Sequence, residues 1–289
     1  MNIFKQMFKR RATRTWFIVT AAVLTLMIVI NVVATSTSIY GLLCILLGRE
    51  RAILADGAQQ VYAHTYGTKA EARAAGEALN ERIVEEGAVL LKNEGALPLS
   101  KGAKISVFGK NSVSLVYGGS GSGGGTHEGA KTIFDSLTKA GFSYNAALKA
   151  FYESKDSGEG RSKELSIEDK GKTKFLYTGE TPQSSYTQAV KDSYAAHKDA
   201  ALVVFSRIGG EGWDLPRVPR NGAEHYLQLD ENERDLLKAV CGAGFPKVIV
   251  VLNTNNPIEL GFLDDPSHPA YDARINGCLW IGTPGDSGI

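Results

Sequence analysis

The sequence has little net charge and few cysteines, and each shortage excludes a class of protein. Its 32 basic and 31 acidic residues leave a formal net charge of +1, so a nucleic-acid partner has no electrostatic support and none is expected. The 3 cysteines are too few for a disulfide scaffold. Because no Cys and His spacing resembles a zinc site, no metal ion is expected, and no other cofactor is expected either.

A long uncharged run near the N-terminus departs from an ordinary globular composition. No charged residue occurs between Trp16 and Ala34, and this length suits a helix that crosses a bilayer. Basic residues precede the run while the following flank is charge-balanced, which places the N-terminus in the cytosol and the bulk of the chain outside. The basic residues are Lys5, Lys9, Arg10, Arg11 and Arg14.

We interpret this run as a signal-anchor rather than a cleaved signal peptide. Cleavage after the pattern of Val32 and Ala34 is the alternative, but the apolar region is long and a second apolar run, 39–47, follows it. The predicted divisions are a cytosolic basic tail (1–14), a transmembrane segment (15–47) and a spacer (48–76). The protein is then a single-pass cell-membrane protein with an extracytoplasmic C-terminal domain.

Residues 77–289 alternate between short apolar runs and amphipathic stretches. This alternation predicts an α/β fold with a mostly parallel sheet flanked by helices. A stripe of apolar residues predicts a helix through Leu90 and Leu91, and another short helix is expected at 258–263. The last strand, 275–281, ends in a Gly-rich turn without a covering helix, so the domain is expected to be incomplete at its end. Strands are expected at 104–109, 142–144, 201–205, 247–253 and 275–281, and further helices at 131–140, 146–152, 186–197 and 230–243.

The segment after the strand at 201–205 contains the candidate functional residues. Ligands of open α/β sheets bind beyond the carboxyl ends of such strands, and Glu211 lies there between two glycines. Trp213 adds a flat apolar face and Asp214 a second carboxylate, a combination that suits sugar chemistry. An ordinary strand-to-helix loop with solvated acids is the open alternative.

A second Gly-rich loop, 117–125, follows the strand at 104–109. Such a loop between strand and helix can cradle phosphate, but it lacks the Gly-Lys-Ser/Thr ending of a P-loop. We interpret it as the rim of an active site, and a nucleotide- or phosphate-binding protein is the alternative.

Several stretches together resemble the second, α/β-sandwich domain of glycoside hydrolase family 3. The Glu-Gly-Ala-Val-Leu-Leu-Lys-Asn run and the Gly-Glu-Gly-x-Asp run, in that order, are the specific part of the resemblance. The matching stretches are Glu86–Glu94 with Leu97–Leu99, Ile105–Gly109, Gly118–Gly125, Gly210–Asp214, Val248–Asn253 with Pro257–Leu260, and Trp280–Gly288.

The resemblance implies a retaining β-glycosidase, β-glucosidase-like, that acts on a carbohydrate substrate. Family members pair the sandwich with a (β/α)8 barrel that supplies an aspartate nucleophile, while a sandwich loop supplies the acid/base glutamate. Glu211 is then the catalytic candidate. Substrate-binding candidates are Trp213 and Asp214, and Arg207 or Arg217 in place of the family arginine that Leu215 replaces. Packing of the loop by Trp213 and a structural role for Asp214 are the open alternatives.

The order of segments resembles membrane-anchored members in which the sandwich precedes the barrel. This chain is then the truncated front part of a domain-permuted protein, with the barrel expected downstream. Without the nucleophile, the fragment alone is expected to be inactive. A membrane-tethered, non-catalytic module that binds carbohydrate or a partner is the alternative.

Overall fold

The computed structural model describes residues 11–36, 38–47, 65–120, 124, 127–161, 179–211, 215, 222–223 and 225–289. The chain divides into two compact units, Met1–His64 and Thr65–Ile289. Each unit is described by itself.

The described part of the first unit is helical. Helix α2 (Arg11–Ser36) is followed by α3 (Ser38–Leu46). Within α2, the segment Arg11–Thr35 contains an 18-residue stretch with a mean hydropathy of 2.6 and is long and apolar enough to cross a membrane. The side chains of Thr15, Thr25 and Thr35 bond to carbonyls one turn back, which satisfies hydroxyls that an apolar setting would otherwise leave unpaired.

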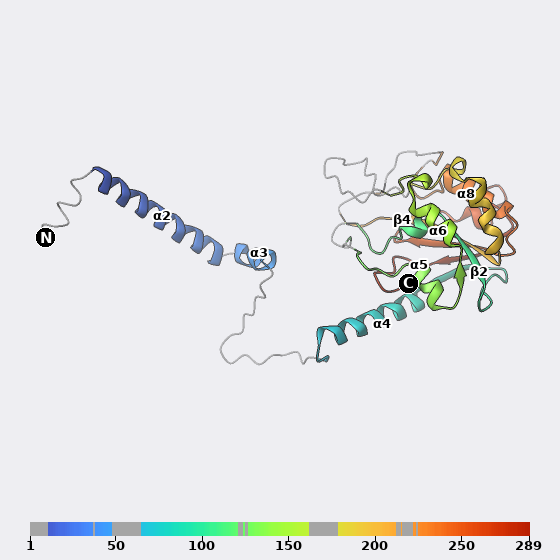
Figure 1. Ribbon diagram of the computed structural model, residues 1–289, viewed down its shortest axis with the longest axis horizontal. Coiled ribbons are helices and arrows are strands. Elements are labelled where there is room, and N and C mark those ends of the chain that lie inside the picture. Colours follow the sequence, from blue (N-terminus) through green and yellow to red (C-terminus); the bar gives the residue numbers. More distant parts are fainter. Residues whose placement is uncertain are drawn as a thin grey trace. The chain divides into compact units, whose positions relative to one another are not determined.

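The second unit is built on a six-stranded sheet with the order β1-β6-β5-β4-β2-β3 (Figure 1). All neighbours run parallel except the edge strand β1, which is antiparallel to β6. The predicted mostly parallel sheet is therefore confirmed. The strands are β1 (Val89–Asn93), β2 (Lys104–Phe108), β3 (Ser143–Tyr144), β4 (Ala200–Arg207), β5 (Val248–Thr254) and β6 (Ile275–Trp280).

Helices cover both faces of this sheet, as predicted. Along β4, Val203 and Phe205 pack with α6 (Ala146–Glu153) and α8 (Glu231–Gly242) in one core. The alternate residues Leu202 and Val204 pack with α5 (Ile133–Lys139) in the other. Because successive strand residues face opposite sides, a continuous apolar run such as β4 is buried on both.

The first helix of this unit, α4 (Lys69–Gly87), differs from the prediction at both ends. It begins at Lys69, inside the predicted spacer 48–76, with Thr68 as its N-cap. It ends at Gly87, and Leu90 and Leu91, predicted as helical, belong to β1. The segment Val89–Asn93 forms a strand because it pairs with β6, which lies almost two hundred residues away in sequence. A local apolar stripe does not reveal such a distant partner.

Two further predicted helices are shorter than expected. The stretch at 186–197 divides into α7 (Gln188–Asp192) and a 3₁₀ turn (Ser193–Ala196). The stretch at 258–263 contains only a 3₁₀ turn (Gly261–Leu263). By contrast, α8 begins at Glu231, close to the predicted start, and Asp230 is its N-cap in a capping box in which Asp230 and Glu233 each bond to the other's backbone N–H.

Candidate active site

The loops that follow β2, β4, β5 and β6 meet at the carboxyl end of the sheet, and Asn253 ties two of them, those after β2 and β6, to the end of β4. This side chain is completely buried near the end of β5. Its Oδ1 accepts hydrogen bonds from Val116 N at 2.6 Å and Ser206 Oγ at 3.0 Å. Its Nδ2 donates to Val116 O at 2.9 Å and Gly282 O at 2.8 Å. The edge where ligands of parallel sheets bind is therefore rigidly braced.

Glu211 lies on the loop after β4 and is exposed at this edge. Its backbone carbonyl accepts a hydrogen bond from Ser120 Oγ at 3.2 Å. Ser120 also forms an isolated parallel bridge with Gly210, and Ser120 N donates to Gly209 O at 3.1 Å. The two Gly-rich loops that were predicted separately are therefore hydrogen-bonded to each other.

The close approach of the two loops requires a glycine at position 210. Its φ is +145°, and a Cβ built there would lie 2.8 Å from Ser120 N. An L side chain would therefore both strain the backbone and collide with the neighbouring loop. The close approach places the carboxylate of the next residue, Glu211, at the exposed rim.

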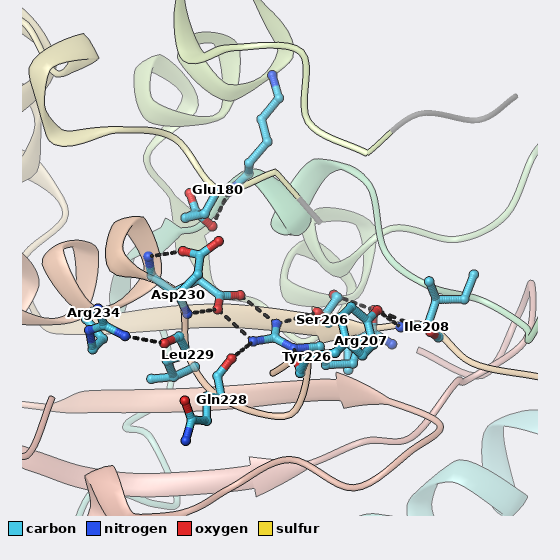
Figure 2. A network of polar contacts seen from close by, with 12 residues as sticks. Glu180, Ser206, Arg207, Ile208, Tyr226, Gln228, Leu229, Asp230 and Arg234 are labelled. Carbon is cyan, nitrogen blue, oxygen red and sulfur yellow. Dashed lines mark hydrogen bonds and ion pairs between the residues drawn. The ribbon is translucent and has the colours of Figure 1, made fainter. Parts of the chain in front are cut away.

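Arg207 does not fit the substrate-binding role predicted for it. The residue ends β4 and is only 3% exposed. Its guanidinium pairs with both carboxylate oxygens of Glu233, at 2.6 and 2.7 Å. Every remaining donor bonds to a backbone carbonyl, those of Ser206, Tyr226 and Gln228 (Figure 2). With all five N–H groups occupied, Arg207 has no donor left for a sugar and is a structural residue.

The electrostatics of this pair favour the charged state. Burial lowers the pKa of Arg207, but the carboxylate of Glu233 outweighs that effect, through its charge and its hydrogen bonds, and the net pKa is raised. The ring of Tyr226 lies 5.5 Å from the guanidinium carbon, and its hydroxyl bonds to the backbone of Ile208. The pair therefore fixes the end of β4 and the start of the Glu211 loop.

The remaining predicted site residues, Trp213, Asp214 and Arg217, lie outside the described residues, as does much of the Gly118–Gly125 loop. Their roles stay predictions. Within the described ranges, no group of three His, Cys, Asp or Glu side chains is placed to hold a metal ion.

Several residues that shape this edge were missed by the sequence analysis. Asn253 and Asn255 stand in a Leu-Asn-Thr-Asn-Asn run at the end of a strand, where amide side chains can satisfy loop backbone. Arg161 donates to Leu115 O at 3.2 Å, and its Nη1 is buried without a hydrogen bond among the described residues. Burial lowers the pKa of Arg161, an effect that nearby tyrosines partly oppose.

A buried carboxyl group, Glu180, was also missed. It is 3% exposed and accepts hydrogen bonds from Lys110 N at 3.0 and 3.1 Å and from Thr181 N at 2.8 Å. Burial raises its pKa to about 8, although the two backbone donors lower it. Figure 2 shows Glu180 in the same polar region as Asp230, whose charge contributes to the rise. No signal in its polar, aperiodic sequence segment indicated this burial.

The fold and this edge define a parallel α/β domain with an exposed carboxylate on a braced loop. The family model described as "Glycosyl hydrolase family 3 C-terminal domain" matches residues 88–288. The chain therefore belongs to glycosyl hydrolase family 3, whose C-terminal domain it contains, as the sequence resemblance predicted.

Curated relatives and solved structures agree with this assignment. The chain is 32% identical to a "Beta-glucosidase" of Ruminococcus albus over 209 residues, covering 68% of this chain and 20% of the relative. It is 29% identical to "Beta-glucosidase A" of Butyrivibrio fibrisolvens over 192 residues, covering 60% of this chain and 22% of the relative.

Among solved structures, beta-glucosidase 3B from Thermotoga neapolitana in complex with glucose is similar at 26% identity. Its TM-score is 0.57, and the match covers 76% of this chain and 28% of that one. A beta-glucosidase from Paenibacillus barengoltzii matches at 26% identity with a TM-score of 0.54, over 73% of this chain and 22% of that one. The chain thus spans less than a third of the length of these relatives.

Proposed function

We propose that this chain supplies the acid/base residue, Glu211, of a retaining, β-glucosidase-like enzyme. The observation that carries the proposal is the exposed position of Glu211 at the carboxyl edge of a family 3 domain, on a loop with a braced backbone. Relatives named as beta-glucosidases support β-glucosides or related sugars as the substrate class. In this proposal the nucleophile comes from a (β/α)8 barrel domain that partners the family 3 C-terminal domain.

In this mechanism Glu211 works twice. It first protonates the glycosidic oxygen while the nucleophile attacks the anomeric carbon and forms a covalent glycosyl-enzyme intermediate. It then removes a proton from water, which releases the sugar. The two carboxyl groups of retaining enzymes stand about 5 Å apart, so Glu211 has to reach a sugar held by the barrel. An exposed side chain at the rim of the sheet is suited to that reach.

The substitution Glu211→Gln in the complete enzyme tests the proposal. Loss of acid assistance should lower kcat/KM roughly 10²- to 10⁴-fold for substrates with poor leaving groups. Activated aryl glycosides need little protonation, so their kcat/KM, which reports formation of the intermediate, should be largely retained. Added azide should then speed release of the sugar, because azide attacks the intermediate without a general base. Glu85→Gln, which changes an exposed glutamate of α4, is the matched control and should leave both activities unchanged.

An equal loss on both substrate classes would remove the acid/base assignment. An enzyme that is indifferent to Glu211→Gln would instead favour the non-catalytic, carbohydrate-binding module. The contrast between leaving groups therefore separates the two functions in one experiment.

The proposal includes a location and a division of the chain. The apolar helix α2 supports a single-pass signal-anchor within 15–47, with the basic tail 1–14 in the cytosol. The spacer and the family 3 domain at 77–289 are then extracytoplasmic. In such a place the enzyme meets sugars outside the cell while tethered to the membrane.

A further inference from the structure

Asn255 binds the Glu211 loop through its side chain. It follows the last residue of β5, and its Nδ2 donates to Gly209 O at 2.6 Å while its Oδ1 accepts from Gly209 N at 2.8 Å. The backbone pairing between β4 and β5 ends at Arg207 and Thr254. Beyond that point, the amide of Asn255 provides Gly209 with the donor and acceptor that a neighbouring strand would offer.

The loop has a second fixed point at Ser120. Gly209 O receives hydrogen bonds from both Asn255 Nδ2 and Ser120 N, and Glu211 O receives one from Ser120 Oγ. The backbone from Gly209 to Glu211 is therefore held from both sides. Because glycine has more conformational freedom than any other residue, a glycine pair before Glu211 stays in one conformation only when such contacts restrain it.

We infer that Asn255 is a positioning residue for the carboxylate of Glu211, an inference that rests on the proposed acid/base function. Asn255 is itself exposed, so its two bonds do little for the core and their effect falls on the loop. Displacing a catalytic group by about 1 Å can cost roughly 10²-fold in rate. Loss of the two hydrogen bonds between Asn255 and Gly209 should therefore reduce acid catalysis and leave the folded domain intact.

The test compares Asn255→Ala with Asn276→Ala in the complete enzyme. Asn276 is a matched control because its Oδ1 bonds to Val248 N, at the opposite end of the same strand β5. Asn255→Ala should lower kcat/KM for poor leaving groups about 10- to 100-fold, with a much smaller loss for activated aryl glycosides. Asn276→Ala should affect the two substrate classes equally.

A double-mutant cycle with Glu211→Gln gives the sharper result. If Asn255 acts through Glu211, Asn255→Ala should have almost no additional effect once Glu211 is replaced. A further 10-fold loss in that background, or an Asn255→Ala variant that behaves as Asn276→Ala does, would overturn the positioning role and leave the acid/base assignment standing. If Glu211→Gln alone fails to distinguish the leaving groups, the function is wrong and the positioning role falls with it.

Discussion

Arg207 and Glu233 form a two-point ion pair inside the domain, with distances of 2.6 and 2.7 Å between guanidinium nitrogens and carboxylate oxygens. The residues come from the end of β4 and the first turn of α8. They are 3% and 1% exposed. Glu233 Oε2 also accepts from Asp230 N at 2.9 Å, so one carboxylate both pairs with the strand and caps the helix.

Glu233→Ala should lower the free energy of unfolding by about 3–5 kcal/mol, because it leaves a buried guanidinium without its counter-charge. Urea unfolding of the full chain in mild detergent, followed by circular dichroism, measures the change. Glu231→Ala is the matched control: Glu231 lies in the same first turn but is exposed, so its loss should cost less than about 1 kcal/mol.

The double replacement Arg207→Met with Glu233→Leu should recover part of the stability lost in Glu233→Ala, although three backbone carbonyls that now accept from Arg207 lose their donor. Apolar residues of similar volume often replace a buried ion pair with little loss, since no charge remains to be desolvated. Thermal unfolding of the single and double variants decides the point. A double variant less stable than Glu233→Ala would show that the backbone carbonyls around Arg207 require the guanidinium itself.

The stability of the domain should decrease between about pH 4.5 and pH 8 because of Glu180. Burial raises the pKa of this carboxyl to about 8 from its ordinary value of 4.5, so the folded state retains a proton that the unfolded state releases across this interval. Stability falls with pH wherever the folded state binds more protons, at most about 1.4 kcal/mol per pH unit for one group.

Unfolding experiments at several pH values across that interval test the role of Glu180. Glu180→Gln removes the titration and should flatten the decline, whereas Glu153→Gln should not. Glu153 is exposed and pairs with Lys149 at the surface, so it makes a matched control. An unchanged slope in Glu180→Gln would assign the pH dependence to other groups.

Removing residues 1–47 should release the protein from the membrane fraction, because this deletion takes away α2 and α3, which carry the proposed anchor. Carbonate washing of membranes followed by immunoblotting measures the distribution. Removing only residues 1–10 keeps α2 intact and should leave the protein membrane-bound. A full-length gene product that is recovered soluble and shortened would instead indicate a cleaved signal peptide.

The sequence predicted the sheet well because its central strands are continuous apolar runs. β4 and β5 are buried along their whole length, and such runs need no distant partner to be recognised. The capping box of α8 is equally local, since Asp230 and Glu233 are three residues apart. The family motifs were recognised for the same reason, because each is a short contiguous run.

Features that depend on distant partners could not be predicted in this way. Arg207 was one candidate for the charge of the family arginine that Leu215 replaces, but its partner Glu233 lies 26 residues further along. The strand β1 was predicted as helix because its partner β6 is almost two hundred residues away. Likewise, nothing near Glu180 in sequence indicates the backbone donor at Lys110, which lies 70 residues earlier.

Asn253 and Asn255 should separate stability from activity although they stand two residues apart. Asn253→Leu conserves volume but leaves Val116 N, Val116 O and Gly282 O without the amide that now pairs with them. An unsatisfied buried polar group costs about 1–3 kcal/mol, so the variant should lose roughly 3 kcal/mol or more of unfolding free energy. Urea unfolding of Asn253→Leu and of Asn255→Leu measures the difference in stability between the two variants.

Asn255→Leu should cost less than about 1 kcal/mol in the same experiment, because Asn255 is exposed and water can replace its bonds to Gly209. Its effect should appear instead in the turnover of substrates with poor leaving groups. Equal losses of stability in the two variants would mean that the hydrogen bonds between Asn255 and Gly209 support the fold of the whole carboxyl edge. The difference predicted here follows from burial alone, since the two side chains offer the same amide and each bonds to loop backbone.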